Sequence, residues 1–97
     1  MATYIMLANW TDQGIRNVKD SPARFDASKD LCRKHGAEIK QLFMTMGAHD
    51  LVVLVEAPGD EAVAKVALAL GAAGNLRTTT MKAFSEAEYR QLTASVG

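Results

Sequence analysis

The sequence predicts a single α+β domain over residues 1–97, with β-α-β-β-α-β elements that build a four-stranded antiparallel sheet. Two β-prone apolar runs, Ile39–Met46 and Leu51–Ala57, flank the link Gly47-Ala48-His49-Asp50, which is typical of a hairpin. Segments with helical periodicity precede and follow this hairpin, and 97 residues is close to the common size of one domain. We therefore expect two long helices on one face of the sheet, plus a short C-terminal helix.

The other elements follow from periodicity and from helix-capping signals. Phe25, Leu31 and Cys32 lie on one helical stripe, which indicates an amphipathic helix packed on the sheet. Ser85 and Glu88 form a capping box that opens the last helix. The expected elements are a strand over Thr3–Trp10, a helical turn from Thr11 to Asn17, a helix from Ser21 to about His35, a helix from Pro58 to Gly71-Ala72-Ala73-Gly74, a strand over Asn75–Phe84 and a helix from Ser85 to about Ser95.

Apolar residues on both faces of the strands predict that both faces of the sheet are covered by other parts of the protein. Leu51–Val55 is apolar at every position, whereas an antiparallel strand with one wet face alternates. Leaving about 600 Å² of apolar surface in water forgoes about 15 kcal/mol at ~25 cal/mol per Å². Because the helices cover only one face, we expect a homodimer at least, with two sheets packed face to face.

Composition narrows the functional classes. Eleven basic residues balance eleven acidic ones, so no excess charge indicates binding to nucleic acid or to an anionic membrane. No run approaches the ~18 apolar residues of a membrane span. The single cysteine, Cys32, fits a reducing compartment, and Met1–Ile5 shows no secretory signal. The expected location is the cytoplasm.

Several blocks of the chain resemble the GYD-domain family, a small bacterial family related to the dimeric α+β barrels. The resemblance implies a ferredoxin-like fold that dimerises, and it implies no single activity, because relatives on the same barrel include monooxygenases, isomerases and haem-dependent enzymes. The family is named for a Gly-Tyr-Asp pattern near the hairpin, and His49 stands here where tyrosine is usual. The matching blocks are Tyr4–Asn17, Lys19–Pro22, Thr45–Val52, Leu68–Gly71 and Gly74–Thr80.

His49 and Asp50 are the candidate catalytic residues. An imidazole titrates near neutral pH, and an adjacent carboxylate would raise its pKa and orient it as a general acid or base. The structural alternative is that Asp50 caps the turn and His49 is merely exposed.

Four residues near the strand ends are candidate ligand-binding groups. Arg77 could bind an anionic group bidentately, or pair with an acidic neighbour instead. Asn9, Trp10 and Asp12 end the first strand, where they could line the mouth of a pocket. As structural residues, Trp10 would pack over the end of the barrel and Asp12 would cap the next turn.

We expect no metal site and no bound cofactor. Cys32 and His35 share one helix face, but zinc requires three or four ligands and the chain has no second cysteine. A haem role stays open, because His49 or His35 could serve as an axial ligand.

Two functions remain open at this point. The first is a non-catalytic binding or assembly module that forms homo-oligomers through its apolar surfaces, which include an alanine-rich second helix with Lys65 as its one charge between Glu61 and Arg77. The alternative is a small enzyme, monooxygenase-like or isomerase-like, that acts on an apolar metabolite in a pocket between the sheet and the helices, with His49 reaching this pocket as general acid or base.

Overall fold

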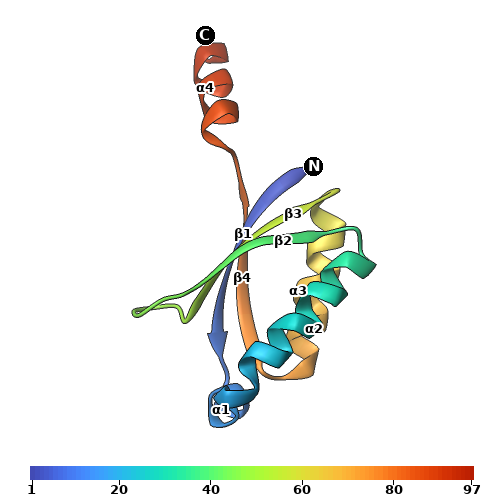
Figure 1. Ribbon diagram of the computed structural model, residues 1–97. Helices are drawn as coiled ribbons and strands as arrows, with labels where there is room; N and C mark the ends of the chain where they lie inside the picture. The colour runs from blue at the N-terminus through green and yellow to red at the C-terminus, as the bar shows by residue number, and fades with distance from the viewer.

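Two long helices cover one face of a four-stranded antiparallel sheet, as the sequence predicts (Figure 1). The computed structural model describes all 97 residues, Met1–Gly97, and its α+β architecture is ferredoxin-like. The elements are β1 (Ala2–Trp10), α1 (Asp12–Arg16), the 3-10 turn η1 (Val18–Asp20), α2 (Ser21–Lys34), β2 (Glu38–Met44), β3 (Leu51–Ala57), α3 (Asp60–Ala73), β4 (Leu76–Ala83) and α4 (Glu86–Ser95).

The strands lie in the order β2-β3-β1-β4, so β1 and β3 form the centre of the sheet. Every neighbouring pair is antiparallel, and Met6 of β1 lies opposite Val53 of β3 and Thr80 of β4. The pairing of β2 with β3 shifts register between Ile39 and Gln41. The two central strands are therefore hydrogen-bonded to a neighbour on each side, and β2 and β4 are the edge strands.

Alternate side chains of the central strands form the core beneath the helices. Tyr4 and Met6 pair with Val55 and Val53, and all four are buried. Val66 of α3 is 1% exposed and packs in the same cluster. Burying one aliphatic side chain of this size stabilises the fold by about 1.5–3 kcal/mol.

The phenol of Tyr4 joins β1 to the first turn of α3. Its hydroxyl donates a hydrogen bond to Oδ1 of Asp60, the first residue of that helix. This bond to the carboxylate raises the pKa of Tyr4, and desolvation adds to the effect. Asp60 also lies at the positive end of the helix dipole, where a negative charge is stabilising.

The hairpin loop is longer than the sequence predicts. The expected strand reached Met46, but β2 ends at Met44 and the loop comprises residues 45–50. The reason is a clasp at Thr45, whose backbone N–H donates to the Asp50 carbonyl (2.8 Å) and whose Oγ1 donates to the His49 carbonyl (2.6 Å). Met46 is consequently placed at the tip, 95% exposed.

Helix α1 packs so closely on the turn between α3 and β4 that only glycine fits at position 14. The Thr11 side chain caps α1 by accepting from the Gly14 N–H (3.1 Å), and the Thr11 N–H donates to the Asn75 carbonyl (3.1 Å). A Cβ atom on Gly14 would lie 2.1 Å from that carbonyl oxygen. The contact fixes the end of β1 against the start of β4.

Helix α4 projects away from the sheet beyond the end of β4 (Figure 1). Its capping box is formed as predicted, with Glu88 N–H donating to Ser85 Oγ and Ser85 N–H donating to Glu88 Oε1. The hydrogen bond that the Ser85 N–H donates to the carboxylate lowers the pKa of the Glu88 carboxyl, and the Ser85 side chain adds to the effect. The projecting helix gives the molecule its long dimension, 51 Å against 30 and 18 Å.

We expect Gly14→Ala to lower the free energy of unfolding by about 1–3 kcal/mol, because the added methyl group overpacks a backbone contact. Urea denaturation followed by circular dichroism measures the change. Gly59→Ser is the matched control, since nothing lies within 4 Å of a Cβ at Gly59 and serine is favoured at this N-cap position. Equal stability of the Gly14→Ala and wild-type proteins would contradict the packing argument.

Tyr4 should ionise at a higher pH in the folded protein than in the unfolded chain. The stability contributed by its bond to Asp60 is then fully present below the ordinary pKa of tyrosine, 10.0, and is lost as pH rises through the raised folded value. Tyrosinate absorbance of a Tyr89→Phe variant follows Tyr4 alone, because the chain has two tyrosines. Adding Asp60→Asn should lower the observed pKa, and an unchanged titration would refute the assignment.

Candidate functional site

The hairpin loop folds back onto the end of β1 and brings most of the candidate site residues to one end of the sheet. The Asp50 N–H donates to the Ala8 carbonyl (3.0 Å), and Asp50 Oδ2 accepts from the Trp10 N–H (3.0 Å). Together with the Thr45 clasp, these bonds hold the loop at both of its ends. Residues 45–50 are therefore held in a defined position against the end of β1.

His49 is oriented by Asn9. The Asn9 Nδ2 donates to the Ala48 carbonyl (2.9 Å), which turns the amide oxygen toward the imidazole. His49 Nδ1 lies 2.9 Å from this Asn9 Oδ1, so the bond requires a proton on Nδ1. In the neutral ring, Nε2 is then left as a hydrogen-bond acceptor or a base.

His49 and Asp50 bond to β1 rather than to each other. Asp50 accepts from a backbone N–H of Trp10, and His49 bonds the Asn9 side chain. Both residues are half-buried. Asp50 therefore fixes the turn through its bond to Trp10, which is the structural role that the sequence offered as the alternative to catalysis. The acid-base role of His49 remains a prediction.

The four candidate ligand-binding residues are divided between different surfaces. Asn9 and Arg77 lie opposite each other on β1 and β4, and Arg77 is exposed. Trp10 lines a cavity on the helix side of the sheet, whereas Asp12 is exposed in the first turn of α1. Of the four, only Trp10 lines this cavity, and the binding roles of all four remain predictions.

A cavity of about 390 Å³ lies between α2 and the helix-covered face of the sheet. Fifteen of its 19 lining residues are hydrophobic, and they come from all four strands and both long helices. A space of this size is unusual in a protein layer, because protein interiors are otherwise closely packed. His49 is not among the residues that line it.

Small side chains at core positions of α2 create this space. Ser28 and Cys32 fall on the stripe that periodicity assigns to the core, and both line the cavity. Burial raises the pKa of the Cys32 thiol, so it stays protonated and unreactive near neutral pH. The enzyme hypothesis expects a pocket between the sheet and the helices that His49 reaches, but the lining includes Arg24 and Ser28, which the sequence does not single out, and it does not include His49.

The opposite face of the sheet has no helix over it. At its centre, Ile5 of β1 lies between Leu54 of β3 and Met81 of β4. Phe43 of β2 and Met81 are 52% and 43% exposed. This outer face, defined by Ile5, Leu7, Phe43, Val52, Leu54 and Met81, is an apolar surface of the single chain.

Neither metal ligands nor a membrane span are found in the structure. No three His, Cys, Asp or Glu side chains gather closely enough to hold a metal ion. His35 caps the C-terminus of α2 while Cys32 is buried in the core cluster. None of the helices combines the length and apolar character needed to cross a bilayer.

Comparison with known proteins places the chain in a family. The family model described as GYD domain matches residues 4–93. The chain is also 30% identical over 89 residues to a protein of Thermus thermophilus named "Glutamine synthetase and cystathionine beta-lyase binding protein". That alignment covers 91% of this chain and 94% of the relative. The chain therefore belongs to the GYD-domain family.

Proposed function

We propose that this protein is a homo-oligomeric binding module that associates with other proteins and works through its apolar surfaces. The observation that carries the proposal is the outer face, where apolar side chains of all four strands are left without cover. Two such faces packed together would form a dimeric α+β barrel. A two-fold dimer of this kind buries the same patch on both copies.

The projecting helix α4 supports self-association. Its ten residues lie below the ~12–15 residues at which an isolated helix becomes stable in water. Tyr89 and Leu92 are 60% and 49% exposed on this helix. Contact with a second copy would supply the packing that one chain does not provide.

The relative from Thermus thermophilus supports protein partners beyond the chain itself. By the name of that relative, we infer that this chain also binds metabolic enzymes such as glutamine synthetase or cystathionine beta-lyase. The exposed side of α3 suits such a contact, since Leu68 is 74% exposed and Ala64 and Ala72 are exposed with it. Lys65 is the one basic residue of this helix, so the surface is easily desolvated.

The alternative function, a small enzyme that uses His49 as general acid or base, has weaker support. The cavity is large enough for a metabolite, but His49 lies outside its lining. The imidazole is instead held by Asn9 at the loop. Turnover of an apolar substrate that disappears in a folded His49→Ala variant would restore this candidate.

Leu54→Glu should convert the oligomer to a monomer, because it places an unpaired charge at the centre of the buried outer face and weakens association by about 100-fold or more. Native mass spectrometry measures the species against the 10.5 kDa chain. Ala27→Glu on the exposed side of α2 is the control and should keep the wild-type mass. A monomeric wild-type protein would refute the dimer.

Leu68→Glu should weaken enzyme binding by about tenfold or more while leaving the oligomer intact, because it charges the proposed contact on α3. Biolayer interferometry with purified glutamine synthetase and cystathionine beta-lyase from the organism that encodes this chain measures the affinity. Ala27→Glu again serves as the control. If neither enzyme binds the wild-type protein, the proposed partners are wrong, and unaltered binding by Leu68→Glu removes α3 from the contact.

A further inference from the structure

We propose that the cavity between α2 and the sheet binds an amphiphilic carboxylate, with its apolar chain in the cavity and its carboxylate on Arg24. This inference is independent of the proposed protein-binding function. It rests on the shape and lining of the cavity and on the state of one guanidinium group.

The walls of the cavity fit an apolar chain. Met6 and Val53 form its floor on the sheet, Leu42 lies on β2, and Phe25 and Leu70 come from the two helices. Its volume of about 390 Å³ falls within the ~300–1,000 Å³ range of small-molecule sites. Small-molecule sites are concave, mostly apolar and carry a few polar groups, and this cavity has the same character.

Arg24 is the one charged residue in the lining. Its Nη1 donates to the Asn17 carbonyl (2.9 Å) and its Nη2 donates to the Gly14 carbonyl (3.1 Å). A guanidinium has five N–H donors, so these two bonds fix its position and leave donors for another acceptor. The group is thus held in place at the wall of an apolar cavity.

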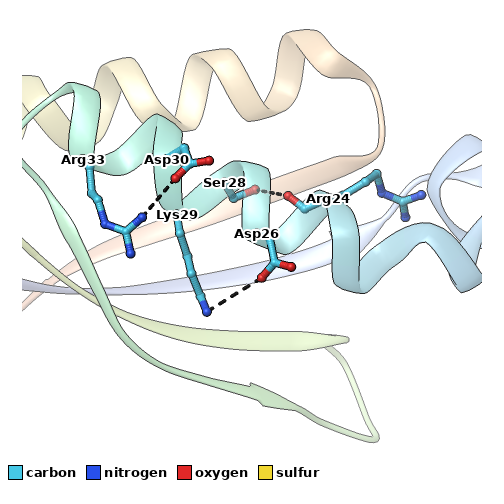
Figure 2. Close-up of polar contacts among 6 residues, drawn as sticks. All are labelled: Arg24, Asp26, Ser28, Lys29, Asp30 and Arg33. Carbon is cyan, nitrogen blue, oxygen red and sulfur yellow. Dashed lines mark hydrogen bonds and ion pairs between the residues drawn. The ribbon is translucent and has the colours of Figure 1, made fainter.

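Arg24 has no anionic partner in the protein. Two other cations of α2 are paired, with Lys29 Nζ 3.9 Å from Asp26 Oδ1 and Arg33 Nη1 3.0 Å from Asp30 Oδ1 (Figure 2), while Lys34 at the C-terminal end of the helix is exposed and lies away from the cavity lining. Figure 2 shows Arg24 extending along the helix axis, away from these pairs. None of the six ion pairs of the structure includes Arg24. A half-buried guanidinium without a counter-ion favours a ligand that brings a carboxylate.

Decanoate is the probe, and decanol is its neutral counterpart. Trp10 lines the cavity and is the only tryptophan of the chain, so its fluorescence reports entry of the ligand. Isothermal titration calorimetry gives the affinity and the stoichiometry. We expect saturable binding of one decanoate per chain, about tenfold tighter than decanol, because the carboxylate adds a charge-assisted bond.

Two pairs of variants locate the binding site. Ser28→Leu fills the cavity and should weaken decanoate binding by about tenfold or more, while Ala27→Leu on the exposed side of α2 should not. Arg24→Met should lower the affinity for decanoate to that for decanol, whereas Arg33→Met should leave both unchanged. Thermal unfolding of each variant checks that it is folded.

Three results would overturn the proposal. If decanoate gives neither a heat of binding in calorimetry nor a change in Trp10 fluorescence with the wild-type protein, the site does not exist. Equal binding by Ser28→Leu and Ala27→Leu would mean that the amphiphile binds elsewhere, for example on the outer face. Equal affinity for decanoate and decanol would exclude the carboxylate contact at Arg24. If Ser28→Leu does not fold, two results still test the proposal: the preference of the wild-type protein for decanoate over decanol, and the loss of that preference in Arg24→Met.

Discussion

The structure depends on one constraint, which is that the central strands β1 and β3 are apolar on both faces while the chain supplies helices for only one. On the covered face, Tyr4, Met6, Val53 and Val55 are buried against α2 and α3. On the other face, side chains of the same strands alternate with them and remain partly exposed. A single chain therefore leaves the apolar side chains of one sheet face partly exposed, and this unburied surface is what supports the association proposed above.

Even the covered face is incompletely filled, and this has a local cause. Helix α2 presents Ser28 and Cys32 to the sheet where longer aliphatic residues would fill the layer. The helix is nevertheless held in position from its N-terminal end, because Arg24 bonds the carbonyls of Gly14 and Asn17. Anchoring at one end and small residues in the middle together keep the cavity open.

Much of the fold follows from the sequence because it depends on local periodicity and capping. The β3 strand, the Ser85 capping box and the order of the four strands and of the helices between them are predicted from the sequence, whereas the 3-10 turn η1 is not. The site is harder to predict because it depends on contacts across the chain. Neighbours in sequence such as His49 and Asp50 suggest a dyad, yet each is bonded to a different group of β1, 40 residues away. The cavity likewise depends on how far α2 stands from the sheet, which no periodicity encodes.

The clasp at the hairpin defines both apolar surfaces at once. Phe43 lies opposite Val52 on the outer face, while the next pair, Met44 and Leu51, faces the cavity. Because side chains alternate along a strand, a slip of one residue would exchange these two pairs and expose cavity residues on the outer face. The bonds from Thr45 to His49 and Asp50, and from Asp50 to β1, hold the pairing against such a slip. The residues that look most like a catalytic pair in the sequence thus lie where the register of the sheet is set.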